Sequence, residues 1–132
     1  MTAPSAAEVF SQTVPAIQSG DVRALLRLCA DDVVFEFPFA PPGWPGKVEG
    51  KRALGEYLAA IPAGVAFDKF DLETHQTVNP DVAVIEMTAT GRVKDTSEPY
   101  EMSYVVVLTV RDGLIVRYRD YYWNPLRALA GS

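Results

Sequence analysis

The 132-residue chain has few of the residues from which thiol and metal sites are built: it contains one cysteine and one histidine. A lone Cys29 excludes an intramolecular disulfide and a thiolate metal cluster, and we interpret it as a small buried hydrophobe. A lone His75 excludes a zinc site made of several histidines. The adjacent acids Asp31 and Asp32 leave an acid-only metal site as a minor alternative to capping or solvated carboxylates. The sequence therefore predicts no metal site.

Several functional motifs are also absent. The chain has no P-loop, no G-x-G-x-x-G fingerprint and no G-x-S-x-G nucleophile motif, so we expect no cofactor. No apolar run approaches the roughly 18 residues that span a bilayer, and the N-terminus has no signal-peptide pattern. Seventeen acids against twelve lysines and arginines disfavour nucleic acid and anionic membranes as partners. We expect one cytoplasmic domain over residues 1–132 with a small-molecule partner.

Helical spacing of apolar residues marks the first half of the chain. Phe10, Val14 and Ile17 fit one helical face, with Pro15 expected to kink or divide the segment and Gly20 to end it. Asp21 is the expected N-cap of a second short helix, whose apolar stripe is Val22, Leu25, Leu26 and Cys29. The same spacing over 51–61 predicts a third helix, which Pro62 should end.

Alternating apolar residues predict strands elsewhere. Residues 33–39 form an early strand, and a loop rich in proline and glycine follows at 40–50. Further strands are expected near 66–77, 82–92, 99–110 and 114–122, with turns at 79–81 and 111–113. The second turn permits a two-residue or a bulged form, so whether Tyr104 or Val105 faces inward stays open. This order of elements indicates an α+β domain with helices on one face of a curved sheet.

Asp120 stands between arginines and aromatic residues in the last predicted strand. Alternation places it on one face with Leu114, Val116, Tyr118 and Tyr122, and places Ile115, Arg117, Arg119 and Tyr121 on the other. On an apolar face, desolvation raises the pKa of a carboxyl group, whereas hydrogen bonds from Tyr118 or Tyr122 lower it. Such a group can act as a general acid or base, and the alternative is a buried aspartate with a structural role. The arginines are expected to pair with acids such as Glu86 on the outer surface.

Aromatic residues elsewhere are candidates for the wall of a pocket around Asp120. Phe35 and Phe37 share a face of the early strand, and Tyr57 lies on the inward stripe of the third helix. Trp44 is either a lid over a cavity or a plug for the edge of the core. His75 alternates away from Phe70 and Leu72, so it is predicted to point away from the core and is a secondary candidate for catalysis.

Three stretches resemble the nuclear-transport-factor-2-like superfamily: "GDVRALLRLCADDVVFEFPF", "VEGKRALGEYL" and "VVVLTVRDGLIVRYRDYYWNPL". The combination is similar to the SnoaL-like branch, and "PFAPPGWPG" with the aromatic-Asn-Pro near the C-terminus resembles the phenazine-biosynthesis A and B proteins. The resemblance implies a cone-shaped barrel formed by a strongly curved, mostly antiparallel sheet with three helices on its concave face. It also implies a ligand pocket between helices and sheet, and a homodimer packed through the outer sheet face.

The resemblance further implies a role for Asp120. In SnoaL-like cyclases an aspartate on the last strand is the acid or base, and Asp120 in "YRDY" matches it. Ketosteroid isomerases share the fold and use an aspartate to abstract a carbon-bound proton without a cofactor. The stretch "VIEMTATG" lacks the Arg-x-Asp pair of limonene-epoxide-hydrolase-like enzymes, which disfavours epoxide hydrolysis.

We therefore predict a cofactor-independent acid/base enzyme of polyketide-cyclase or isomerase type, acting on a small, largely apolar carbonyl compound. The alternatives are a binding protein without catalysis and a structural dimerisation module whose interior is filled by its own side chains.

Overall fold

The computed structural model describes residues 3–40, 42–60 and 65–123. Helices α1 (Ala6–Ser19) and α2 (Val22–Arg27) are followed by β1 (Cys29–Glu36), β2 (Lys47–Glu49) and α3 (Lys51–Ala60). Four strands complete the described chain: β3 (Val65–Gln76), β4 (Val82–Val93), β5 (Pro99–Arg111) and β6 (Leu114–Trp123). None of the described helices combines the length and the apolar character needed to cross a membrane.

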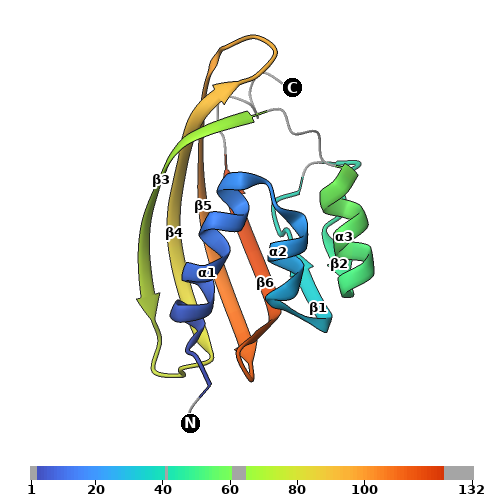
Figure 1. The fold of residues 1–132 in the computed structure, drawn as a ribbon, viewed down its shortest axis with the longest axis vertical. Coiled ribbons are helices and arrows are strands. Elements are labelled where there is room, and N and C mark those ends of the chain that lie inside the picture. The colour runs from blue at the N-terminus through green and yellow to red at the C-terminus, as the bar shows by residue number, and fades with distance from the viewer. Residues whose placement is uncertain (1–2, 41, 61–64, 124–132) are drawn as a thin grey trace.

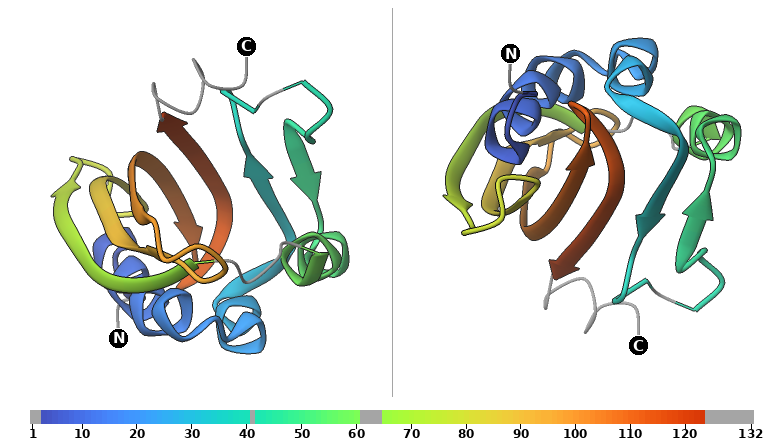
Figure 2. Two further views of the ribbon diagram at one scale, coloured as in Figure 1. Left: turned by 90° about the horizontal axis from the view of Figure 1, so that it is seen from above. Right: turned by 90° about the horizontal axis from the view of Figure 1, so that it is seen from below.

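The six strands form one sheet in the order β2-β1-β6-β5-β4-β3. Strands β1 and β6 pair in parallel, and the other neighbours are antiparallel. The three helices lie on one face of this sheet, and its long strands bend around α1 (Figures 1 and 2). The predicted α+β class is confirmed. Because β2 and β3 are unpaired edges within the described residues, the sheet is open rather than closed into the expected barrel.

Local sequence signals set the ends of the first two helices. The Ser5 side chain accepts a hydrogen bond from the Glu8 backbone N–H, and Glu8 reaches back to Ser5, which forms a capping box at the start of α1. Gly20 ends α1 in the left-handed conformation, with φ 70°. Pro15 does not divide the helix, which runs continuously to Ser19. Asp21 caps α2 as predicted, with its carboxylate accepting from the Ala24 N–H.

Two expectations about the segment after α2 were wrong. Helix α2 ends at Arg27, so Cys29 begins β1 instead of belonging to the helix, although it is buried as predicted. The proline-rich loop at 40–50 contains the short strand β2, in which Val48 is buried and pairs with Phe35. The predicted helix stop at Pro62 and the Asn-Pro near the C-terminus lie outside the described residues.

The core lies between the helices and the inner face of the sheet. Side chains from five elements are almost fully buried there: Phe10 of α1, Leu54 of α3, Ile85 of β4, Leu108 of β5 and Ile115 of β6. Burial of large apolar side chains of this kind contributes most of the stability of a small domain. These buried side chains pack β6 against the helices.

A bulge near the start of β6 decides which residues of this strand face inward. Asp112 and Gly113, with φ 53° and 78°, form a two-residue turn, and Ile115 pairs with Val110. Thr109 then pairs with Arg117, so Val116 is an extra residue. As a result Ile115 is buried and Leu114 is 39% exposed, the reverse of the predicted alternation.

From Tyr118 onward the predicted alternation is confirmed. The same register turns Tyr104 inward, where its ring meets that of Tyr122, and leaves Val105 40% exposed on the outer face. This answers the question that the "RDG" turn left open in the sequence.

Candidate functional site

Asp120 lies on the inner face of β6, opposite Val106 of β5. The residue as a whole is partly exposed, but its Oδ1 atom is buried and has no hydrogen-bond partner among the described residues. Burial raises the pKa of the Asp120 carboxyl from 3.8 to about 7. No hydrogen bond from Tyr118 or Tyr122 lowers this pKa, so of the two opposing effects expected from the sequence only desolvation operates.

Four tyrosines lie close enough to this carboxyl group for its charge to affect them. Burial raises the pKa of Tyr57, Tyr104, Tyr118 and Tyr122, and the negative charge of Asp120 raises each of them further. Their hydroxyl groups therefore stay protonated at neutral pH and remain hydrogen-bond donors. The Tyr104 hydroxyl is 3.1 Å from that of Tyr100. Tyr104 was not among the predicted site residues, because the two possible forms of the "RDG" turn left open whether Tyr104 or Val105 faces inward.

An aromatic wall continues from Asp120 toward α3. The ring of Tyr118 stacks on that of Phe35, and Phe35 is next to Phe37 with ring centroids 6.5 Å apart. Phe37 in turn packs against Tyr57, with centroids 5.5 Å apart. The structure thus brings together three of the predicted wall residues, Phe35, Phe37 and Tyr57, with Tyr118 of the strand that carries Asp120.

Trp44 is not part of this wall. Its side chain is 55% exposed, and no ring contact joins it to another aromatic residue in the described part of the chain. Of the two alternatives for Trp44, the plug for the edge of the core was therefore wrong, and the lid stays a prediction.

The arginines flanking Asp120 face the opposite side of the sheet, as predicted, and their partner is Glu36 of β1. Arg117 donates a hydrogen bond to the Glu36 carboxylate, and Arg119 Nη2 lies 3.6 Å from Glu36 Oε1. The Arg117 hydrogen bond holds the pKa of Glu36 below its usual value. The expected partner Glu86 is instead engaged by His75, with Nε2 2.7 Å from the Glu86 carboxylate. Asp120 is thus separated from these positive charges by the sheet itself.

His75 is exposed on the outer face of β3, as its alternation predicted. The sheet therefore does not bring it to the inner-face carboxyl group. His75 is therefore not part of the Asp120 site, and its secondary candidacy for catalysis stays a prediction.

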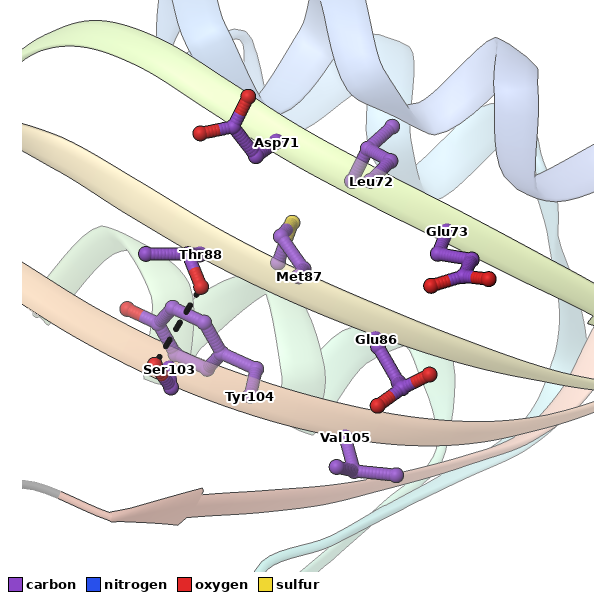
Figure 3. A pocket seen from close by; sticks show the side chains of 9 residues that line it. All are labelled: Asp71, Leu72, Glu73, Glu86, Met87, Thr88, Ser103, Tyr104 and Val105. Carbon is purple, nitrogen blue, oxygen red and sulfur yellow. Dashed lines mark hydrogen bonds between the residues drawn. The ribbon is translucent and has the colours of Figure 1, made fainter.

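Two hollows on the described surface lie away from Asp120. One, of about 390 Å³, is on the outer face of β3, β4 and β5 and is lined by residues that include Asp71, Glu73, Glu86, Thr88 and Ser103 (Figure 3). We call it the outer-face hollow. The other, of about 360 Å³, is lined by residues around Cys29, Lys51 and Arg111, where Arg111 also lies 3.4 Å from Asp32. Neither hollow includes the Asp120 carboxyl group.

The fold is that of the nuclear-transport-factor-2-like class. A model of the SnoaL-like domain matches residues 10–118, and the chain belongs to this family.

Two relatives extend over most of the chain. An uncharacterized Bacillus subtilis protein is 39% identical over 116 residues, which cover 85% of this chain and 78% of the relative. An uncharacterized PhzA/B-like protein of Pseudomonas aeruginosa is 33% identical over 125 residues, covering 95% and 88%. The second supports the local resemblance to the phenazine-biosynthesis proteins.

Solved structures agree with the fold. The crystal structure of a candidate isomerase from Bacillus subtilis is 34% identical, with a TM-score of 0.84 and coverage of 96% of this chain and 94% of the other. A Mycobacterium tuberculosis protein in complex with estradiol-17β-hemisuccinate is 26% identical, with a TM-score of 0.76 and coverage of 94% and 96%.

Proposed function

We propose that this protein is a cofactor-independent proton-transfer enzyme of cyclase or isomerase type, in which Asp120 is the acid/base. The observation that carries the proposal is the buried, unpartnered Oδ1 of Asp120, whose carboxyl has a pKa of about 7. A general base or acid works best when its pKa is close to the operating pH. An aspartate with an ordinary pKa would be a much weaker base at neutral pH.

The reaction that fits this group begins at a carbon next to a carbonyl. The Asp120 carboxylate takes the proton, and the electrons of the broken C–H bond move into an enolate. The neutral carboxyl then returns the proton at another position, or the enolate attacks a second carbonyl group of the same molecule and the new alkoxide takes the proton. Both routes regenerate the carboxylate and involve no oxidation or reduction.

The surrounding tyrosines suit this chemistry. Their hydroxyl groups are protonated and can donate hydrogen bonds to an oxygen that becomes negative in the transition state, which is a large contribution in many enzymes. Phe37 and Tyr57, which are half-buried and backed by the buried ring of Phe35, would offer an apolar surface to the substrate. A small, largely apolar carbonyl compound is the substrate class that matches both features.

A binding protein without catalysis is the second candidate. It is favoured by the estradiol-17β-hemisuccinate complex of the Mycobacterium tuberculosis relative. The same aromatic wall would hold an apolar ligand, and the Asp120 carboxyl would accept or donate one hydrogen bond to it. The two candidates share a site and differ in whether a proton moves.

The deciding experiment follows hydrogen exchange at carbon. Purified protein without added cofactors is incubated in D₂O with a panel of cyclic and aromatic ketones, and loss of the α-proton signal is measured by NMR. We expect exchange with at least one ketone, slowed about 100-fold or more in Asp120→Asn, since a single acid/base group typically contributes 10²–10⁴-fold. Asp68→Asn, an exposed aspartate of β3, is the matched control and should exchange at the wild-type rate.

The outcomes separate the candidates. Equal exchange by wild type and Asp120→Asn would rule out Asp120 as the base. Saturable binding of estradiol-17β-hemisuccinate by wild-type protein, with no exchange on any ketone, would favour the binding protein.

We also infer from the family that the protein is a homodimer packed through the outer sheet face. Val105, 40% exposed on that face, and the half-buried Tyr121 are apolar residues that a second copy would cover. Sedimentation velocity of wild type against Val105→Glu tests this: the variant should sediment as a monomer.

A further inference from the structure

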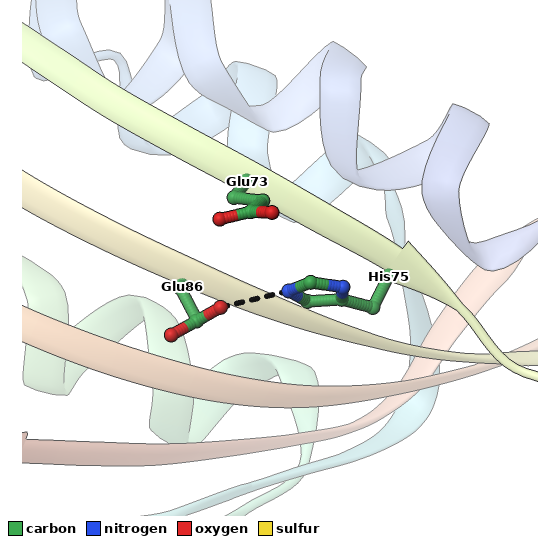
Figure 4. A group of neighbouring side chains, drawn as sticks. All are labelled: Glu73, His75 and Glu86. Carbon is green, nitrogen blue, oxygen red and sulfur yellow. Dashed lines mark hydrogen bonds and ion pairs between the residues drawn. The ribbon is translucent and has the colours of Figure 1, made fainter.

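Three ligand-type side chains gather on the outer face of the sheet, opposite Asp120. Glu73 and His75 are two residues apart on β3 and therefore point to the same face. Glu86 of β4 is the direct cross-strand partner of Glu73. One ligand atom from each of the three lies within 4.8 Å of the other two (Figure 4).

The charges of this group are not balanced by basic side chains. Two carboxylates directly opposite on neighbouring strands repel each other and destabilise the pair. The neighbouring lysine is engaged elsewhere, with Lys69 Nζ 3.3 Å from Asp71. Among the described residues no hydrogen bond or salt bridge involves Glu73, and the only ion-pair partner of Glu86 is His75, an imidazole. The arrangement therefore holds two negative charges beside a single ring nitrogen donor.

We propose that Glu73, His75 and Glu86 form a binding site for a divalent transition-metal cation of the zinc type. Imidazole nitrogen with carboxylate oxygen is a ligand set that suits such cations, whereas calcium and magnesium prefer oxygen alone. A bound cation replaces the repulsion between the two carboxylates with attraction to a shared positive charge.

The geometry allows the three ligands to converge. Zinc is bound at about 2.0–2.2 Å by nitrogen and oxygen, which places the ligand atoms of a tetrahedral ion roughly 3.4 Å apart. Atoms at the 4.8 Å limit must approach each other by roughly 1.4 Å, whereas His75 Nε2 and the Glu86 carboxylate, now 2.7 Å apart, must separate by roughly 0.7 Å. All three side chains are exposed, and rotation about their χ angles provides this movement without a shift of the backbone.

Three protein ligands leave a fourth position of a tetrahedral ion open. Glu73 and Glu86 also line the outer-face hollow, so in the single chain this position has room for water or a small anion, and in a dimer packed through this face the second copy would lie over it. The site is on the opposite face from Asp120 and does not depend on the proton-transfer function proposed above.

The test uses the full chain without an affinity tag, freed of metal with a chelator. Zn²⁺ is titrated by isothermal calorimetry and Co²⁺ by visible absorption, and we expect one ion per chain in both. Because His75 is the only histidine of the sequence, one imidazole spin system reports ligation directly in an NMR titration with Zn²⁺. Bound Zn²⁺ should also raise Tm, since it binds the folded state.

Variants identify the ligands. We expect His75→Ala, Glu73→Gln and Glu86→Gln each to weaken binding at least about tenfold, because each removes one of three ligands. Asp71→Asn is the matched control: it removes an exposed acid of the same strand and face, and should bind within about twofold of wild type. Circular dichroism confirms that each variant is folded.

Two results would overturn the site. One is equal affinity for Zn²⁺ in wild type and His75→Ala. The other is an Asp71→Asn protein that loses as much affinity as Glu73→Gln, which would indicate general attraction to a negative surface. Either result would leave the hydrogen-exchange test of Asp120 unaffected, so the two proposals fail separately.

Discussion

Phe35 and Tyr118 stack face to face across the parallel pair β1 and β6, with ring centroids 4.4 Å apart and ring planes inclined by 6°. Phe35 is 5% exposed and Tyr118 is 6% exposed, so both rings belong to the core as well as to the wall of the candidate site. The contact joins the strand that carries Asp120 to the strand that leads toward α3. Packing in the core thus fixes the position of the proposed catalytic carboxyl.

We expect Phe35→Ala to destabilise the protein by about 3 to 5 kcal/mol, because it removes a buried ring and leaves a cavity. Urea denaturation at pH 7 measures the free energy of unfolding. Phe39→Ala is the matched control from the same segment: its ring is 56% exposed, and its loss should cost less than about 1 kcal/mol. Similar losses in the two variants would show that the stacked pair is not part of the stabilising core.

Asp120→Asn should stabilise the protein at neutral pH and leave stability nearly unchanged near pH 3. The folded-state pKa of about 7 lies above the ordinary 3.8, so the folded protein holds this proton more tightly than the unfolded chain. The protonated carboxyl therefore contributes stability below about pH 4. This contribution falls as pH rises from about 4 to about 7, and above that pH it is absent. The rise from 3.8 to about 7 corresponds to roughly 4 kcal/mol as an upper bound.

Tm of wild type and Asp120→Asn measured from pH 3 to pH 8 checks this prediction. Asp68→Asn, which removes an exposed carboxyl, should follow the wild-type curve. A Tm difference between wild type and Asp120→Asn that is constant over this pH range would mean that the carboxyl is not desolvated in the folded state.

The sequence was sufficient to place Asp120 on the inner face and its neighbouring arginines on the outer one, because a strand alternates with a period of two. It was not sufficient for the start of β6. Leu114 and Ile115 are both apolar, so their order does not reveal the extra residue Val116 or which of the two is buried. The three residues of β2 are likewise too few for any period to be seen.

The apolar stripe that ends at Cys29 gave a wrong helix boundary for a similar reason. Cys29 is buried whether it ends a helix or begins a strand, so its apolar character does not mark the boundary. The pairing of Glu36 with Arg117 depends on the parallel register of β1 and β6, which are about 80 residues apart. The contact between His75 and Glu86 depends on how many residues the loop between β3 and β4 contains.

Gly91→Ala should destabilise the protein by about 1 to 3 kcal/mol or more. A Cβ atom at this position would lie 2.1 Å from the Ala66 carbonyl oxygen and 2.9 Å from Phe67 Cα, and both are backbone atoms that cannot turn away. Gly91 pairs with Phe67 next to the register shift of β3, so the close approach belongs to this irregularity. The variant should lose the pairing of β3 there, with faster amide exchange in 66–70 measured by mass spectrometry.

Gly46→Ala is the control for this prediction. An added Cβ at Gly46 meets no atom within 4 Å, so its free energy of unfolding should stay within about 0.5 kcal/mol of wild type. A Gly91→Ala protein as stable as Gly46→Ala would mean that β3 can move aside at no cost.

Glu36→Gln should have the opposite pH dependence to Asp120→Asn. The hydrogen bond from Arg117 lowers the pKa of Glu36 from its ordinary 4.5, so the carboxylate contributes stability above that value and the contribution is lost as pH falls through the folded-state pKa. Because the group is near the surface, the loss at pH 7 should be less than about 1 kcal/mol and should shrink in 1 M salt. Tm at pH 3 and pH 7, each at low and high salt, gives the four values needed.

Hydrogen exchange with ketones should be unchanged in the Glu36→Gln variant, since Glu36 is on the face of the sheet opposite Asp120. A Tm loss that persists at pH 3 and in 1 M salt would assign the effect to packing of the Glu36 side chain and not to its charge.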